Sequence, residues 1–145
     1  MSEVRAQALV DSPISTVWGL VGDPNRYPEW LPRVLEVRGE RFEEGEEFVQ
    51  VSQQPLFGQT EAHFLMDRRD ELREIRMHCT ISGMFVHWQL TEAQGGTFLH
   101  AVFGMEPLRP RDRLADITVG RRFFSRWLAE AVESLKSAAC ERTTG

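Results

Sequence analysis

The chain has 145 residues, of which 41% are hydrophobic and 27% charged, and its formal charge at pH 7 is −5. This composition is ordinary for one globular domain, and the length is sufficient to bury a core without disulfides or a metal. The negative charge disfavours nonspecific attraction to nucleic acid, so we expect no nucleic-acid partner. No apolar run is long enough for a spanning helix, and the start lacks the apolar core of a secretory signal. We therefore expect a cytoplasmic protein without stable membrane insertion.

Residues 4–10 are predicted to form the first strand, and two short helices follow it. Ser12 is a candidate N-cap with Pro13 at the first helical position, and apolar residues then recur at helical spacing. Gly22 and the following Asp23–Pro24 pair end this helix, and a second helix is expected from about residue 24 to residue 31. The prolines favour two short helices joined by a sharp turn over one long helix.

Six strands with period-two alternation are predicted between residues 33 and 106, separated mostly by turn signals rich in glycine and acidic residues. A long amphipathic helix is expected over about residues 113–140. Its predicted apolar face consists of Leu114, Ile117, Phe124, Trp127, Leu128, Ala131, Leu135 and Ala138. Residues 141–145 are expected to form a frayed tail.

This element order, without a repeat or linker, predicts one domain over residues 1–140. Successive hairpins make the sheet antiparallel, and the single long helix must cover one of its faces. We therefore predict an α+β helix-grip architecture: a seven-stranded curved antiparallel sheet around a long C-terminal helix, with two short helices after the first strand.

Four segments of the sequence resemble segments of a known superfamily. They are SPISTVWGLVGD, DPNRYPEWLP, WQLTEAQGGTFL and FFSRWLAEAVESLK. Together they resemble the START-like (SRPBCC, helix-grip) superfamily, in particular its polyketide cyclase/dehydrase and lipid-transport branch, and the resemblance covers essentially the whole chain. The segment DPNRYPEWLPRV is also similar to the matching segment of the coenzyme Q-binding subgroup. The fold hosts binders, carriers and enzymes, so the resemblance does not specify an activity.

Alternation divides the predicted strands into an apolar face, which must contact the long helix, and a polar face. The apolar face carries Ala62, Phe64, Met66, Ile75, Met77, Cys79, Ile81, Val86, Trp88, Leu90, Leu99, Ala101, Phe103 and Met105. From spacing alone a solid core is favoured, but the family resemblance implies a cavity between sheet and helix. The residues then expected to contact a hydrophobic ligand are Tyr27, Trp30, Phe64, Met66, Met77, Cys79, Trp88, Leu90, Phe103, Phe124 and Leu128.

The four histidines, His63, His78, His87 and His100, all have the parity of the polar face. Assumed turns at Ser82–Gly83 and at residues 92–95 place them directly opposite one another, as a row across the sheet. We favour a solvent-facing row, which could be a subunit contact of a homodimer together with Phe85 and Phe98. A metal site is disfavoured because neighbours on a flat sheet diverge. A slip of one residue would turn the row inward as acid–base groups.

Other chemical motifs are absent from the sequence: no glycine-rich phosphate loop, HExxH motif, paired CxxC motif or nucleophile elbow occurs. We expect no cofactor and no metal. Cys79 and Cys140 are expected to be reduced thiols. Burial is expected to raise the pKa of Cys79 and make it a poor nucleophile. Five arginines flank the start of the long helix, as a solvated basic surface or as a contact for an anionic head group: Arg109, Arg111, Arg113, Arg121 and Arg122.

Three functions remain open at this point. The leading hypothesis is a binder or carrier of a hydrophobic small molecule such as a lipid, an isoprenoid quinone or an aromatic polyketide. The second is a cyclase or dehydratase that uses the same cavity, with a histidine or Arg76 as its polar participant. The third is an interaction module or a coenzyme Q-binding chaperone, which a filled core with an exposed apolar patch would favour.

Overall fold

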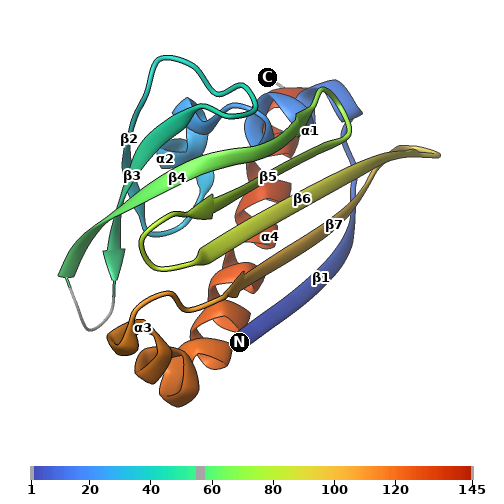
Figure 1. Ribbon diagram of the computed structural model, residues 1–145. Helices are drawn as coiled ribbons and strands as arrows, with labels where there is room; N and C mark the ends of the chain where they lie inside the picture. Colours follow the sequence, from blue (N-terminus) through green and yellow to red (C-terminus); the bar gives the residue numbers. More distant parts are fainter. Residues whose placement is uncertain (1, 55–57, 145) are drawn as a thin grey trace.

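The computed structural model describes residues 2–54 and 58–144, and its centre is one antiparallel sheet of seven strands in the order β1-β7-β6-β5-β4-β3-β2. The strands are β1 (Ser2–Val10), β2 (Val34–Arg38), β3 (Glu47–Gln54), β4 (Gly58–Asp70), β5 (Glu74–Cys79), β6 (Met84–Ala93) and β7 (Gly96–Met105). The curved sheet wraps around the C-terminal helix α4 (Arg121–Thr144), which crosses behind it in Figure 1. The predicted helix-grip fold is confirmed.

Two short helices close one end of the sheet, as the prolines predicted. They are α1 (Ile14–Val21) and α2 (Tyr27–Trp30), joined through the 3-10 turn η1 (Pro24–Arg26). The Asp23 side chain caps η1 by accepting a hydrogen bond of 3.1 Å from the Asn25 amide. The start of α1 differs by one residue from the prediction, because Pro13 is the N-cap and no side chain caps the helix.

The predicted long helix is interrupted near its start. Helix α3 (Pro110–Ala115) leads into the π-helical turn η2 (Asp116–Gly120), and α4 begins only after that turn. A π turn inserts an extra residue and shifts the phase of the helix, so an apolar stripe upstream no longer continues the stripe downstream. Leu114 and Ile117, predicted to face the sheet, are accordingly 65% and 75% exposed. At the other end α4 extends to Thr144, so most of the expected frayed tail is helical, and Arg142 pairs with Glu29 at 2.7 Å.

The assignment of side chains to the two faces of the sheet is confirmed for almost every predicted position. Of the predicted apolar face, the buried members are Phe64, Met66, Ile75, Met77, Cys79, Val86, Trp88, Leu90, Leu99, Ala101 and Phe103. Ile81 is the exception, with 39% of its surface exposed, because β5 ends at Cys79 and Ile81 lies in the following loop.

The registers of the hairpins differ from the predicted ones by two residues, which preserves the faces and changes the partners. His78 lies opposite Phe85 and His87 opposite Arg76, because the loop between β5 and β6 has four residues, not two. At the next hairpin the turn has two residues, not four, and His100 lies opposite Gln89. The predicted row of directly opposed histidines is therefore wrong.

Candidate functional site

The interior between the sheet and α4 is apolar, and every residue predicted to contact ligand lies in it. These residues belong to one hydrophobic core and are at most 5% exposed: Tyr27, Trp30, Phe64, Met66, Met77, Cys79, Trp88, Leu90, Phe103, Phe124 and Leu128. They come from α2, from four strands and from α4. The fold thus gathers, in one volume, residues as far apart in the chain as Tyr27 and Leu128.

Ring contacts run through this interior from α2 to α4. Trp30 meets Trp88 edge to face at 5.7 Å between ring centroids, Trp88 meets Phe103 at 5.5 Å, and Phe103 meets Trp127 at 4.9 Å. These are favourable aromatic geometries, so the side chains predicted to line a cavity here fill the space by contacting each other. A ligand that enters between the sheet and α4 has to displace part of this packing.

Tyr27 and Trp30 use their polar atoms to complete α1. The Tyr27 hydroxyl donates a hydrogen bond of 2.7 Å to the Val21 carbonyl, and Trp30 Nε1 donates one of 3.1 Å to the Leu20 carbonyl. The last carbonyls of a helix have no partner within it, so these bonds satisfy groups that would otherwise be buried unpaired. Burial, assisted by the charge of Asp23, raises the pKa of Tyr27 above its ordinary value. These two hydrogen bonds show why the segment 17–32 is rich in aromatic residues and prolines: it closes this end of the sheet and satisfies the end of α1.

A polar pair lies on the inner face of β3, in line with Phe48. Gln50 and Ser52 are 2% and 3% exposed, and Gln50 Nε2 donates to Ser52 Oγ at 3.4 Å. In the described part of the sheet the other buried polar side chain is Thr97, which bonds the carbonyl of Ser12. Alternation did not predict this pair, because β3 has apolar residues at both parities and neither face could be assigned.

Arg69 is a second inward polar residue that the sequence analysis missed. The ladder between β4 and β5 shifts between Met66 and Arg68, and this bulge turns Arg69 toward α1. Its Nε donates to the Gly22 carbonyl at 3.2 Å, and its guanidinium lies 5.5 Å from the centre of the Trp18 ring. Nothing in the pattern of residues marks the bulge.

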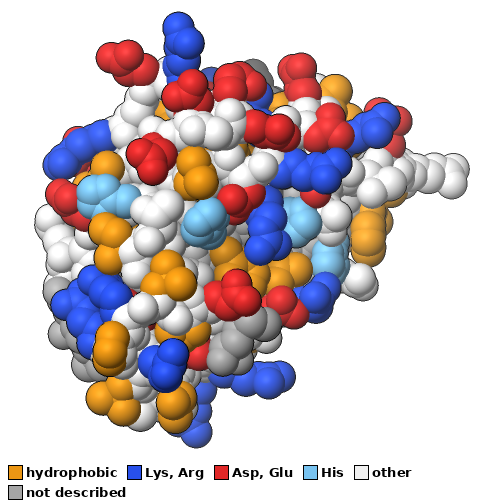
Figure 2. All heavy atoms as spheres, viewed as in Figure 1, with side chains coloured by type: hydrophobic (Ala, Val, Ile, Leu, Met, Phe, Trp, Pro, Cys, Tyr) orange, Lys and Arg blue, Asp and Glu red, His pale blue; other side chains and the backbone are white. Residues whose placement is uncertain are grey.

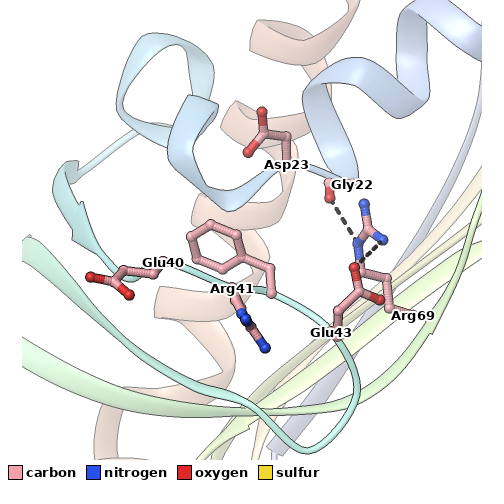
Figure 3. A pocket seen from close by; sticks show the side chains of 7 residues that line it. Gly22, Asp23, Glu40, Arg41, Glu43 and Arg69 are labelled. Carbon is pink, nitrogen blue, oxygen red and sulfur yellow. Dashed lines mark hydrogen bonds and ion pairs between the residues drawn. The ribbon is translucent and has the colours of Figure 1, made fainter.

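Arg69 forms one wall of a surface pocket of about 440 Å³ at the end of the sheet that α1 and η1 cover. Figure 3 shows Arg69 reaching from the sheet toward Gly22 and Glu43, whose carboxylate is 3.4 Å from the guanidinium. The lining consists of Gly22, Asp23, Glu40, Arg41, Phe42, Glu43 and Arg69. A neighbouring pocket of about 370 Å³ is lined by Glu44, Asp67, Arg68, Arg69 and Asp70. Both linings are mostly charged, and neither includes a residue predicted to contact ligand.

The thiol of Cys79 differs from its predicted behaviour. Burial raises its pKa, but hydrogen bonds from Ser82 and from the backbone near Ile81 and His63 outweigh burial, and the net pKa lies below the ordinary value of cysteine. The Ser82 amide is 3.4 Å from Sγ. The expected rise in pKa is therefore wrong, because the loop after β5 folds back and aims donors at the sulfur.

The histidines lie on the outer face of the sheet, away from α4. His78 Nδ1 is 2.8 Å from the Asp67 carboxylate, and His87 Nε2 is 2.7 Å from Glu74. Figure 2 shows this face, on which the histidines are scattered among charged side chains. Arg76 shares the face and lies 5.1 Å from the centre of the Phe85 ring. None of these groups points into the interior, so the structure does not support the cyclase hypothesis in the form that uses a histidine or Arg76.

The comparisons with known proteins agree with this geometry. The family described as "Polyketide cyclase / dehydrase and lipid transport" matches residues 1–139. The chain belongs to this family. Among curated proteins, none matches this sequence.

Solved structures extend the similarity to the whole fold. Protein NE0264 from Nitrosomonas europaea superposes with a TM-score of 0.77 at 13% identity, covering 99% of this chain and 97% of that one. Protein BH1534 from Bacillus halodurans superposes with a TM-score of 0.75 at 18% identity, over 96% and 97% of the two chains. The di-domain ARO/CYC StfQ from the steffimycin biosynthetic pathway gives 0.74 at 17% identity, over 99% of this chain and 52% of that one. At these identities the similarity shows the fold alone.

Two further features of this structure concern metal-binding side chains and membrane-spanning helices. In the part of the chain that the structure describes, no group of three or more His, Cys, Asp or Glu side chains is placed to hold a metal ion. No helix in that part combines the length and hydrophobicity that crossing a membrane would require. The interior described above offers apolar contact, the Gln50–Ser52 pair and the Cys79 thiol, and it also holds Thr97 and the inward-turned Arg69, each bonded to a backbone carbonyl.

Proposed function

We propose that this protein binds a hydrophobic small molecule between the sheet and α4, and that Gln50 and Ser52 supply its polar contacts. A lipid, an isoprenoid quinone or an aromatic polyketide has the matching chemistry, with a large apolar surface and few polar atoms. Membership of the family supports the proposal, and so does the apolar character of the inner face.

The observation that carries the proposal is the burial of Gln50 and Ser52 among apolar side chains. A buried amide or hydroxyl costs stability unless it is well paired, and the bond between these two is long, at 3.4 Å. An apolar pair at these positions would serve the core better. A polar pair becomes favourable here if a ligand atom completes its hydrogen bonds, and those bonds then orient the ligand.

Entry of a ligand requires the interior side chains to move, because the aromatic rings contact each other. The methionines Met66, Met77 and Met84 belong to the same hydrophobic core as these rings and are at most 7% exposed. Methionine has three rotatable bonds and a polarizable sulfur, so it adapts its shape at low cost. We infer that rearrangement of these side chains makes room for the ligand.

The experiment begins with mass spectrometry of an organic extract from protein purified without detergent. A stoichiometric lipid, quinone or polyketide supports binding and identifies its class. Thermal shift with a fatty acid, a short-chain ubiquinone and an anthraquinone follows on the extracted protein. No co-purified molecule together with no shift by any of these compounds would overturn the proposal.

Variants of β3 then test the role of the polar pair. Gln50→Leu is expected to weaken binding of the probe by about tenfold, the loss of one buried hydrogen bond. Gln53→Leu is the matched control, because Gln53 lies on the same strand but is exposed on the other face. If the two variants are both folded and bind the probe with equal affinity, Gln50 does not contact the ligand and this part of the proposal is wrong.

A cyclase-type reaction in the same interior is the second candidate. One observation favours it, namely that the inner face of β5 holds a thiol whose pKa is lowered. A lowered pKa raises the fraction of thiolate at neutral pH, and a thiolate at this place would serve as the general base for ring closure of a polyketone chain. Faster cyclisation of a linear poly-β-ketone by the wild type than by Cys79→Ala, at equal affinity, would support it, and equal rates would exclude the thiol.

A further inference from the structure

Large apolar side chains are exposed together at the end of the molecule where α3 lies. Leu108, Leu114 and Ile117 are 61%, 65% and 75% exposed. Leu108 belongs to the segment before α3, and its amide bonds the Ser82 carbonyl at 3.3 Å, which brings the β5–β6 loop and the 39% exposed Ile81 to the same end. Figure 2 shows hydrophobic and basic side chains gathered there, over the α3 segment of Figure 1. We call the segment 106–122 the α3 tip.

The local structure explains why these side chains are not buried. Leu114 and Ile117 are three residues apart, so they share one face of the α3–η2 segment. The π turn rotates this face away from that of Phe124 and Leu128, which α4 buries against the sheet. Helix α3 therefore leaves its apolar face unpartnered, where a continuous α-helix would have turned it inward.

The charges of the α3 tip have the opposite sign to those of the whole chain. Residues 106–122 include five arginines and three acidic residues, a formal charge of +2 in a chain that totals −5. Asp112 and Asp116 are buried, and Asp112 is bonded to Arg109. The exposed charges are thus four arginines against Glu106: Arg111, Arg113, Arg121 and Arg122.

We propose that the α3 tip is a docking surface for an anionic lipid bilayer. Leu108, Leu114 and Ile117 would enter the boundary between head groups and acyl chains, and the flanking arginines would contact the anionic head groups. The charge distribution selects this orientation, because the rest of the molecule is acidic and is repelled by the same surface. Arg111 and Arg121 flank the apolar pair at helical spacing, three residues before Leu114 and four residues after Ile117.

A second copy of the chain is a poorer occupant of the α3 tip. In a symmetric dimer the same patch meets itself, so the two sets of exposed arginines would lie against each other. Three exposed apolar side chains also cover far less area than a stable protein interface requires. A bilayer meets both demands, since it supplies negative charge and accepts protruding side chains without a matching surface.

Co-sedimentation with large unilamellar vesicles tests the proposal and requires no knowledge of the bound ligand. We expect binding to vesicles of phosphatidylcholine mixed with phosphatidylserine and little binding to phosphatidylcholine alone. Binding should weaken as sodium chloride is raised, because the Debye length shortens to about 8 Å at physiological ionic strength. Absence of binding to the phosphatidylserine vesicles at low salt, or equal binding to both vesicle types, overturns the proposal.

Variants locate the surface. The Leu114→Ser/Ile117→Ser double variant is expected to lose about tenfold or more in partitioning. Each arginine near the surface contributes about fivefold, so Arg111→Gln/Arg121→Gln is expected to lose about 25-fold. All four side chains are exposed, so the variants are expected to keep the wild-type circular dichroism and melting temperature.

Matched control variants replace the same types of residue outside the α3 tip. Arg26→Gln/Arg38→Gln removes the same charge from side chains elsewhere that are 41% and 56% exposed, and Leu35→Ser removes a leucine that is 48% exposed on β2. Both controls are expected to bind phosphatidylserine vesicles as the wild type does. Vesicle binding that falls equally in tip and control variants would show that another surface docks and would overturn the assignment. Failure here leaves the proposed ligand binding intact, since that is measured without lipid bilayers.

Discussion

Gly83 approaches the backbone of Glu106 so closely that a Cβ atom at Gly83 would lie 1.8 Å from the Glu106 carbonyl oxygen. Gly83 has φ of +85° and accepts a hydrogen bond of 2.9 Å from the Glu106 amide. This contact joins the β5–β6 loop to the segment that leads into α3. Only glycine satisfies both the left-handed backbone and the lack of space.

Substitution of Gly83 therefore tests how this end of the molecule is held. Gly83→Ala is expected to lower the free energy of unfolding by about 3 kcal/mol or more, from backbone strain and from the clash. Gly95→Ala is the control, because Gly95 has φ of +82° but open space around it. It should cost about 1 kcal/mol, the strain alone. Urea unfolding measures both, and equal losses would show that the close contact is not rigid.

The bond from Tyr27 to Val21 predicts the effect of removing one hydroxyl. Tyr27→Phe leaves the ring in place and the Val21 carbonyl buried without its 2.7 Å partner. We expect a loss of about 1–3 kcal/mol in the free energy of unfolding, the cost of an unsatisfied buried acceptor. Chemical denaturation followed by tryptophan fluorescence measures it. A variant as stable as the wild type would indicate that water reaches this carbonyl.

The raised pKa of Tyr27 predicts alkaline sensitivity. The unfolded chain ionises near the ordinary value of 10.0, whereas burial keeps the folded phenol protonated above it. The stabilisation is fully present below pH 10.0 and is lost as pH rises above that value, because only the unfolded state releases the proton. Tyr27 is the only tyrosine, so tyrosinate absorbance reports it alone. We expect tyrosinate to form together with unfolding; its formation in a still-folded protein would contradict the burial.

Arg69 and Arg68 are neighbours on β4, and we expect them to contribute very differently to the free energy of unfolding. Arg69→Met removes the bond to the Gly22 carbonyl, the pair with Glu43 and the contact with the Trp18 ring. We expect it to cost about 1–3 kcal/mol in the free energy of unfolding. Arg68→Met removes the pair that the exposed Arg68 side chain makes with Glu74 and should cost at most about 0.5 kcal/mol. Thermal denaturation compares the two, and a reversed order would contradict the inward position of Arg69.

The outer-face position of the histidines predicts that they do not take part in ligand binding. His78→Gln and His87→Gln remove the contacts with Asp67 and Glu74 but leave the interior unchanged. Affinity for whichever hydrophobic probe binds the wild type should stay within a factor of about two of the wild-type value. A tenfold loss in a folded variant would show that the outer face and the interior are coupled.

Alternation along the strands was sufficient to predict which side chains face α4. Side chains point to opposite faces with period two, so the hairpin registers could shift by two residues and still leave Met77 and Trp88 buried. The shift changed the partners of the histidines because loop length sets the register. The bond between Gly83 and Glu106, which joins the loop to a distant segment, is invisible in the local sequence.

The polar residues of the interior were the least predictable part of the candidate site. Arg69 turns inward because a bulge near Asp67 adds one residue to β4, and a bulge has no reliable signature in a single sequence. Gln50 turns inward although Val49 and Val51 made the opposite face of β3 equally apolar. Cys79 gained hydrogen bonds from Ser82 that only the folded loop provides.

The sequence by itself determined the order of the elements, the helix-grip family and the apolar face of the sheet, because these follow from local periodicity and from prolines and glycines at chain reversals. The tertiary structure decided which polar side chains turn toward the interior and where the long helix is interrupted. Both depend on contacts between distant residues, which select a bulge at Asp67 and a π turn before Arg121 that no local preference specifies.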